Sequence, residues 1–216
     1  MDDLNHLETV AIVGGTGHLG YAIARRLARA GRRVILGSRS GERAQKLAAE
    51  LGYGCTGATN AEAAAAGDIV IVTVPFASQE AVLAEITEMV AGKIVVDTTV
   101  PLMPPKVMRV QMPQEGSAAI RAQRLLGDRV RVVSAFHNVA AHKLSTDAKI
   151  DCDILVFGDD KAARAKVVEI ASALGLRGLH GGALVNSAAA EAFTSVLIFL
   201  NKTYGIDGAG IQITGM

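Results

Sequence analysis

Six residues near the start of the chain have the types and the spacing that bind a phosphate group. Gly15-Thr16-Gly17-His18-Leu19-Gly20 reads G-x-G-x-x-G and directly follows an apolar run typical of a buried strand. The first glycine permits a tight turn, the second lets backbone amides approach a pyrophosphate, and the third lets helix and strand pack closely. The helix N-terminus then offers free N–H groups to the phosphate. This spacing predicts dinucleotide binding; a purely structural glycine turn is the alternative.

The residues after the second predicted strand indicate which dinucleotide binds. A site that prefers NAD usually ends this strand with Asp or Glu, which holds the ribose hydroxyls. Here the sequence reads Gly37-Ser38-Arg39-Ser40, and Arg43 lies one turn into the next helix. Two guanidiniums and the hydroxyls of Ser38 and Thr16 suit a 2′-phosphate. We therefore predict NADP rather than NAD; the alternative is that both arginines are ordinary solvated residues.

The fourth predicted strand, residues 68–74, leads into Val74, Pro75 and Phe76. Ligands of open α/β sheets bind beyond the carboxyl ends of the strands. These three residues are therefore a candidate apolar ledge for a nicotinamide ring. Pro75 is equally consistent with a plain strand terminator, and the residues alone leave both interpretations open.

Acid–base residues are sparse in the chain. An enzyme that oxidises an alcohol usually needs a proton acceptor such as His, Tyr or Lys, yet no tyrosine has a lysine four residues later. His137 is a candidate proton carrier or hydrogen-bond donor to a ligand, and a structural histidine is the alternative. His137 and His142 have no further ligand at a metal-binding interval, so no metal site is predicted. This inventory suits hydride transfer between two cofactors, for which no catalytic residue is required.

Alternating strands and helices must position these residues. Short β-branched runs, such as residues 9–13 and 68–74, alternate with alanine-rich helical stretches. Asn60 is predicted to cap a helix that ends at Gly67, and Ser78 to cap the next helix. The pattern predicts a Rossmann-like, doubly wound α/β fold with a mainly parallel sheet and a small C-terminal α/β extension. We divide the chain into a nucleotide-binding Rossmann domain, residues 1–140, and a smaller C-terminal region, residues 141–216.

Composition excludes several classes of protein. The 216 residues carry 22 basic and 21 acidic side chains and only 4% aromatics, so no nucleic-acid partner is predicted. The acidic start, Met1–Asn5, lacks the regions of a secretory signal, and no apolar run reaches the roughly 18 residues of a membrane span. Cys55 and Cys152 are predicted to be free thiols. We expect a cytoplasmic protein without a membrane partner.

The last predicted helix, residues 187–204, carries apolar side chains almost all round its axis between Phe193 and Leu200. Such a helix must be buried on more than one side. A homodimer interface and a fully internal core helix both explain this pattern.

A series of short motifs extends along the chain from about Thr9 to Gly215. They are Ile12–Gly20, Gly37–Arg39, Val74-Pro75, Lys93–Asp97, Val100-Pro101, Gly116–Ala119, Val133–His137, Gly158–Asp160 and Asn186-Ser187. Individually these motifs are modest. Their order and spacing together resemble the NADPH-dependent reductases of coenzyme F-420, the 8-hydroxy-5-deazaflavin carrier.

The resemblance implies a dimeric oxidoreductase with NADP(H) in the Rossmann domain and a C-terminal region that helps to hold the deazaflavin. Carried over by position, the residues at the 2′-phosphate are Thr16, Ser38, Arg39 and Arg43, and those at the pyrophosphate are His18 and Leu19. The nicotinamide side is Val74, Pro75 and Phe76, and the deazaflavin border is Val100, Pro101, Ala135, His137, Val139 and Ala140. Hydride then passes directly between stacked rings, with water excluded and no covalent intermediate.

The sequence departs from the family pattern at several positions. Arg43 stands where lysine is common, Phe76 where tryptophan is found, and Asn138–Ala140 where some members carry a proline. An eight-residue leader precedes the first strand. Three other functions fit the nucleotide site: an NADP-binding redox sensor or regulator, a small NADPH-dependent imine or ketone reductase, and a ferric reductase. The imine reductases would need a longer helical C-terminal domain, and the ferric reductases carry a membrane region.

Overall fold

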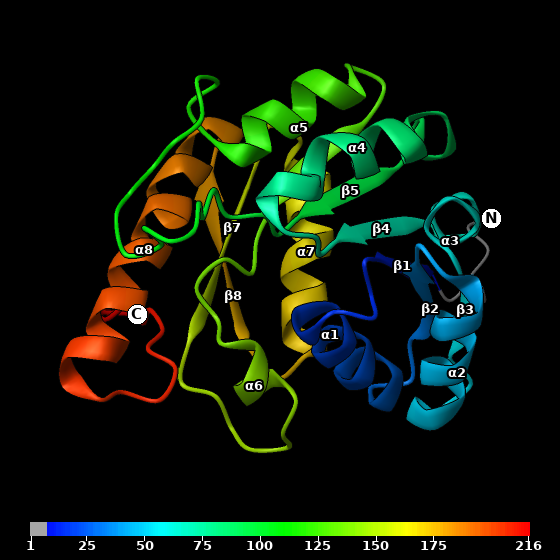
Figure 1. Ribbon diagram of the computed structural model, residues 1–216, viewed down its shortest axis with the longest axis horizontal. Helices are drawn as coiled ribbons and strands as arrows, with labels where there is room; N and C mark the ends of the chain where they lie inside the picture. The colour runs from blue at the N-terminus through cyan, green and yellow to red at the C-terminus, as the bar shows by residue number, and fades with distance from the viewer. Residues whose placement is uncertain (1–7) are drawn as a thin grey trace.

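In the part of the chain that the structure describes, eight strands form one sheet (Figure 1). The computed structural model describes residues 8–216, so Met1–Asn5 and nearly all of the leader lie outside the described residues. The strand order is β3-β2-β1-β4-β5-β6-β7-β8, and every neighbouring pair is parallel except β6 and β7. The strands are β1 (Thr9–Val13), β2 (Arg33–Ser38), β3 (Thr56–Thr59), β4 (Ile69–Val72), β5 (Ile94–Asp97), β6 (Arg131–Ser134), β7 (Asp153–Gly158) and β8 (Arg177–Gly182). The predicted Rossmann-like α/β class is confirmed.

Helices cover both faces of the sheet and enclose two apolar cores. One core lies beneath α1, α2 and α7, and the other lies beneath α3, α4 and α5 (Figure 1). The helices are α1 (His18–Arg29), α2 (Gly41–Leu51), α3 (Asn60–Ala66), α4 (Phe76–Ile86), α5 (Ala118–Leu126), α6 (Ala141–Leu144), α7 (Lys161–Ala173) and α8 (Ser187–Tyr204), with short 3-10 helices η1 (Thr87–Val90) and η2 (Leu184–Asn186). Strands β1, β4 and β5 are buried on both faces, which explains their continuous apolar sequences.

The register of the parallel strands brings their carboxyl ends to one edge. Val13 pairs with Val72, Val72 with Asp97, and Asp97 with Ser134. The segments that follow these strands therefore start side by side, although Val13 and Ser134 are 121 positions apart in sequence. This edge carries most of the residues that the sequence identifies as ligand-binding candidates.

Two predicted helix caps are wrong. Thr59, rather than Asn60, caps α3: its hydroxyl accepts the Glu62 N–H, and the Glu62 carboxylate accepts the Thr59 N–H in return. Helix α4 begins at Phe76, directly after Pro75, so Ser78 lies in its first turn instead of capping it. Proline is compatible with this position because a helix N-terminus does not use its first N–H groups internally.

Residues 141–216 continue the same sheet through β7 and β8. The two parts of the chain are also joined by Arg26 of α1, whose guanidinium donates four hydrogen bonds to carbonyl oxygens of the C-terminal part. Nε bonds Leu144, Nη1 bonds Leu174, and Nη2 bonds Thr146 and Ala148, at 2.7–2.9 Å. A half-buried guanidinium satisfied in this way ties α1 to the segment that contains α6.

Helix α8 lies against α5, β7 and η2. Within the described residues, the segment Leu184–Tyr204 is long and apolar enough to cross a membrane, and core helices of globular proteins pass the same test. The buried residues of α8 include Ser187, Glu191 and Ser195, so the face that packs on the protein is partly polar. Cys55 is half-buried, Cys152 is buried, and both are free thiols.

Candidate functional site

The glycine-rich loop makes the tight turn that its sequence predicts. Gly14 has a φ of +75°, and the Gly15 N–H donates both to the Ile12 carbonyl at 3.1 Å and to the Gly37 carbonyl at 2.8 Å. Helix α1 then starts at His18 without a side-chain cap. Its first N–H groups therefore remain available to an anion.

Gly20 shows why the third glycine of the motif is required. A Cβ atom at Gly20 would lie 2.5 Å from the Thr73 hydroxyl and 2.8 Å from Gly15 Cα. The missing side chain lets α1 pack directly on the turn and on the end of β4, where Thr73 Oγ1 donates to the Val13 carbonyl at 3.0 Å. The loop and β4 are thus held at a fixed separation.

Asn60 is a site residue that the sequence analysis misassigned as a cap. Its side chain is buried, and its Oδ1 accepts the Gly14 N–H at 3.1 Å. A Cβ at Gly37 would lie 3.2 Å from the same oxygen. Asn60 therefore holds the phosphate loop in place through Gly14, which lies 46 positions away in the sequence. No local pattern in the sequence indicates this contact, because it depends on how β3 and α3 pack beside β1.

The end of β2 presents hydroxyl and guanidinium groups together. Ser38 is buried, and its Oγ accepts the Thr16 hydroxyl at 3.4 Å and the Ser40 N–H at 3.3 Å. Ser40 caps α2 by accepting the Arg43 N–H at 3.3 Å. Arg39 and Arg43 are exposed at this point, which leaves both guanidiniums accessible to a ligand.

A cavity of 610 Å³ joins the phosphate loop, the end of β2 and the end of β4. It brings together seven of the predicted nucleotide-binding residues, Gly17, Thr16, Ser38, Arg39, Arg43, Val74 and Pro75, and adds Asn60 and the face of α4 around Ala81. Phe76 does not line it. Its ring lies under the Arg121 guanidinium, 4.3 Å from the ring centroid, and its carbonyl accepts from Arg121 Nη2 at 3.3 Å. Arg121 thereby holds the start of α4 in place.

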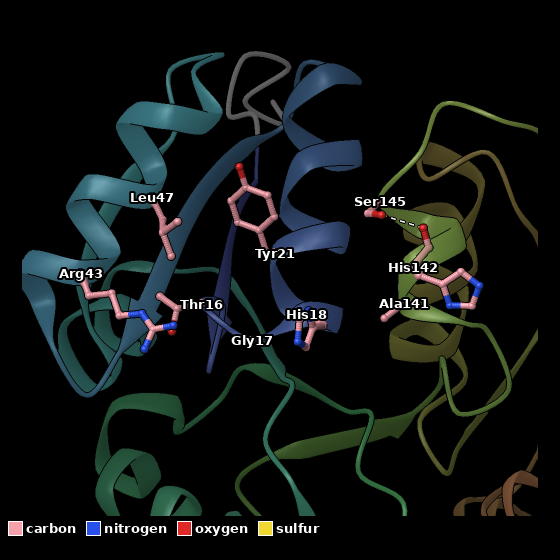
Figure 2. A pocket seen from close by; sticks show the side chains of 9 residues that line it. All are labelled: Thr16, Gly17, His18, Tyr21, Arg43, Leu47, Ala141, His142 and Ser145. Carbon is pink, nitrogen blue, oxygen red and sulfur yellow. Dashed lines mark hydrogen bonds between the residues drawn. The ribbon is translucent and has the colours of Figure 1, made fainter. Parts of the chain in front are cut away.

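A second groove, of 580 Å³, lies on the other side of the phosphate loop (Figure 2). Figure 2 shows Tyr21 and Leu47 between α1 and α2, His18 at the start of α1, and Ala141, His142 and Ser145 on the facing segment. Thr16, Gly17 and Arg43 line both cavities. The two hollows therefore adjoin at the place where a 2′-phosphate is predicted.

The predicted deazaflavin-border residues follow β5 and β6. Because Asp97 pairs with Ser134, and the Ala135 N–H donates to the Asp97 carbonyl at 3.2 Å, Val100-Pro101 and residues 135–140 belong to adjacent segments of the carboxyl edge. Of the six predicted border residues, only Ala140 lines one of these cavities, a smaller one of 180 Å³ that Asn138 also lines. Ala135, His137 and Val139 are buried.

His137 is a neutral imidazole at physiological pH. Burial lowers its pKa from 6.5 to about 3, since a charged ring would lose its hydration. Its Nε2 lies 2.7 Å from the Ser134 hydroxyl, and its ring is tilted against Phe157. The hydrogen bond to Ser134 therefore gives His137 a structural role. Because its ring is neutral near pH 7, it carries no extra proton to donate as a general acid.

Two buried carboxyl groups lie behind this edge, and the sequence analysis identified neither. Glu191 of α8 accepts the Ala118 N–H at 2.6 Å and the Ala119 N–H at 3.1 Å, at the start of α5. Asp97 accepts from Gln79 Nε2 at 2.6 Å and from the Thr99 hydroxyl. Burial raises the pKa of both groups, and that of Glu191 reaches about 7, with the charge of Asp97 adding to the shift. The Glu191 carboxylate lies at the N-terminus of α5, where the helix dipole favours a negative charge.

The raised pKa of Glu191 predicts a pH-dependent stability. The pKa of Glu191 is about 7 in the folded state and 4.5 ordinarily. The protonated carboxyl therefore stabilises the fold fully below about pH 4.5, and this stabilisation is lost as the pH rises through about 7. Glu191→Gln removes this titration. Between pH 5 and pH 8 the free energy of unfolding should therefore fall less in the variant than in the wild type, and the difference between the two falls should be up to about 3 kcal/mol. Urea denaturation at both pH values measures this difference. Glu80→Gln, at an exposed site on α4, should retain the wild-type slope; equal slopes in all three proteins would contradict the assignment.

No cluster of three or more His, Cys, Asp or Glu side chains suitable for a metal ion occurs among residues 8–216. The groups at and behind this edge are backbone N–H donors, hydroxyls, two guanidiniums, apolar side chains and the buried His137, Asp97 and Glu191.

Comparison with known proteins identifies relatives along the whole chain. The family model described as NADP oxidoreductase, coenzyme F-420-dependent, matches residues 9–101. The F-420-dependent NADP reductase of Methanothermobacter thermautotrophicus is 38% identical over 220 residues, covering 96% of this chain and 95% of the relative. That of Methanocaldococcus jannaschii is 37% identical over 221 residues, covering 96% and 98%. A crystal structure from Arthrobacter sp. FB24, provisionally described as an F-420-dependent NADP reductase, has the same fold, with a TM-score of 0.83 at 24% identity over 97% of this chain and all of that one.

Proposed function

The chain belongs to the family of F-420-dependent NADP reductases, and we propose that it is an oxidoreductase that transfers hydride directly between NADP(H) and coenzyme F-420. The observation that carries this proposal is the cavity beside the phosphate loop, where Arg39 and Arg43 replace the carboxylate of an NAD site. The sparse acid–base chemistry of the edge supports it, because hydride passes between the two rings without a protein intermediate.

The residues present fit NADP. The turn at Gly15 and the bare packing surface at Gly20 form a cradle that a Cβ would fill, and α1 starts without a side-chain cap. Gly15 and Gly17 would form the turn beside the pyrophosphate, and His18 and Leu19, in the uncapped first turn of α1, would hold it through their backbone N–H groups. In the same arrangement Thr16, Ser38, Arg39 and Arg43 would bind the 2′-phosphate, and Val74, Pro75 and Phe76 would bound the nicotinamide.

The second ring would lie over the ends of β5 and β6. Val100, Pro101, Ala135, His137, Val139 and Ala140 would border it. When both coenzymes are bound, they supply the hydride donor and acceptor themselves. The contribution of the chain is to orient the rings and to exclude water. His137 would contribute at most a neutral hydrogen bond, consistent with its lowered pKa. In this proposal residues 1–140 form the NADP-binding domain, and residues 141–216 complete the deazaflavin site and the dimer.

One assay tests the function. Purified protein is incubated with NADPH and oxidised coenzyme F-420, and the visible absorbance of the deazaflavin is followed over time. The proposal expects the band to disappear, and expects it to return when NADP and reduced coenzyme are supplied. An NADP-binding sensor would bind NADPH, measured by calorimetry, and leave the band unchanged. Turnover of an imine, a ketone or ferric iron in place of the coenzyme would favour the rival reductases.

We also propose that the protein is a homodimer joined through α8. Phe193, Val196 and Phe199 recur every three residues along the helix and are 41%, 37% and 50% exposed. An apolar stripe of this kind commonly marks an interface with a partner. Charge repulsion and lost apolar contact should make Phe199→Glu elute as a monomer in size-exclusion chromatography, whereas Lys202→Glu, on an exposed polar position of the same helix, should elute with the wild type. A wild-type protein that elutes as a monomer would contradict the proposal.

The remaining partners follow from composition and chemistry. The formal charge of +1 gives no electrostatic reason for nucleic-acid binding. Free Cys55 and Cys152 suit a reducing compartment. We therefore place the protein in the cytoplasm, with small-molecule coenzymes as its partners and the exposed side of α8 against a second copy rather than a membrane.

A further inference from the structure

The C-terminal tail, defined here as residues 207–213, folds back along the start of β7. The Asp153 N–H donates to the Ile211 carbonyl at 2.7 Å, and the Ile213 N–H donates to Asp153 Oδ2 at 2.6 Å. Arg177 of β8 donates to both carboxylate oxygens of Asp153 and, through Nη2, to the Ile213 carbonyl. The paired guanidinium lowers the pKa of Asp153, so its carboxylate stays charged at neutral pH. The tail is thus fixed to the sheet by backbone and charged hydrogen bonds.

From this anchor the tail packs on the loop that follows β6. A Cβ at Gly208 would lie 2.8 Å from Ala140 Cβ, and one at Gly210 would lie 3.5 Å from the Asn138 carbonyl oxygen and 2.7 Å from Cys152 Sγ, just before β7. Asp207 also pairs with His142 of α6, with a distance of 2.8 Å between Oδ1 and Nε2. The Asp207–His142 pair is exposed and adds little by itself, so close packing of the two glycines is the main contact.

Helix α8 holds the same loop from its other side. Asn138 Nδ2 donates to the Ala190 carbonyl at 2.9 Å and to Thr194 Oγ1 at 3.0 Å, and Thr194 Oγ1 lies 3.1 Å from the His137 carbonyl. Residues 137–142 are therefore enclosed between α8 and the tail. At the end of this loop, Ala141 and His142 form the wall that faces His18 in Figure 2.

We propose that the C-terminal tail is a positioning element of the deazaflavin site: by packing on Ala140 through Gly208, it sets where the loop of residues 137–142 stands relative to the nucleotide. The inference rests on the proposed function. Hydride transfer without a catalytic acid depends on the separation and alignment of two rings, so a wall that moves by a fraction of an ångström affects coenzyme binding. The tail contacts the loop of residues 137–142 and reaches the phosphate loop only through Ala141 and His142, so a change in the tail should affect coenzyme F-420 more than NADPH.

Two glycines of the chain end provide a matched pair for the test. Gly208 has a φ of +73° and Gly215 a φ of +86°, so alanine is strained at both, but nothing lies within 4 Å of a Cβ at Gly215. Gly208→Ala should raise the KM for coenzyme F-420 about tenfold while the KM for NADPH changes less than about twofold. Gly215→Ala should leave both constants near wild type. If both variants have the wild-type KM for the coenzyme, or if Gly208→Ala weakens both substrates equally, the proposal is wrong.

A second pair of variants decides the question if Gly208→Ala does not fold. Asn201 Oδ1 accepts the Ala209 N–H at 2.7 Å and tethers the tail to α8. Asn201→Ala should raise the KM for the coenzyme about threefold, as expected for one lost hydrogen bond, and Asn201→Asp, which keeps the acceptor oxygen, should restore it. An unchanged KM in Asn201→Ala overturns the proposal. Wild-type protein that fails to bleach the deazaflavin contradicts the proposed function instead, so the two failures are distinguishable.

Discussion

Arg39→Ala should raise the KM for NADPH about 100-fold, because two charge-assisted hydrogen bonds of about 1.5 kcal/mol each correspond to two factors of ten. Turnover at saturating NADPH should fall much less, since the 2′-phosphate is remote from the hydride and its binding energy is the same in the ground and transition states. Steady-state kinetics with NADPH and NADH measure both effects. The KM for NADH should hardly change, so the preference between the two nucleotides should largely disappear.

The control for this substitution is Arg124→Ala. Arg124 is exposed on α5 and lines neither large cavity, so its removal should leave both nucleotides unaffected. An Arg39→Ala enzyme that uses NADPH as well as the wild type would show that the groups at the end of β2 do not contact a 2′-phosphate. Adding Arg43→Ala to the Arg39→Ala enzyme would then show whether the Arg43 guanidinium alone binds the 2′-phosphate.

Gly20→Ala should destabilise the protein by about 2 kcal/mol and weaken NADPH binding about tenfold, because a methyl group here forces α1 away from the turn. The Cβ would lie 2.5 Å from Thr73 Oγ1 and within 3.0 Å of two backbone atoms of the loop. Backbone cannot move aside as a flexible side chain does. Urea denaturation gives the change in the free energy of unfolding, and calorimetry gives the NADPH affinity.

Gly41→Ala is the matched control, since Gly41 begins α2 and its Cβ would meet Thr59 at an ordinary 3.6 Å. This variant should remain within about 0.5 kcal/mol of the wild type. If Gly20→Ala binds NADPH with wild-type affinity, the close packing of α1 on the glycine-rich turn is not required for phosphate binding.

The fold, the glycine-rich turn and the grouping of residues at the end of β2 were predictable because their signals are local. The G-x-G-x-x-G spacing fixes a turn, a helix start and a packing contact within six residues, and the structure builds all three. The strand alternation likewise leads to the parallel sheet. The residues at the end of β2 are contiguous in sequence, so reading Ser38-Arg39 was enough to locate them.

What the sequence did not reveal depends on distant pairs. Asn60 meets Gly14 across 46 positions, and Glu191 meets Ala118 across 73. Each is a polar residue within an otherwise ordinary helical pattern, and only the packing of the helices explains its burial. The assignment of caps to Asn60 and Ser78 failed for a related reason. A stronger local partner, the Thr59–Glu62 box, and the fixed geometry of Pro75 started those helices earlier.

Arg26 restricts movement between the N-terminal and C-terminal parts of the chain. Its four hydrogen bonds join α1 to the carbonyls of Leu144, Thr146 and Ala148, at the end of α6 and just beyond it, and to the carbonyl of Leu174 after α7. If residues 141–216 rotated against α1, the half-buried Arg26 guanidinium would lose its hydrogen-bond acceptors. The sheet would also have to break between β6 and β7. The Arg26 bonds and the shared sheet therefore both oppose a hinged movement of residues 141–216 against α1.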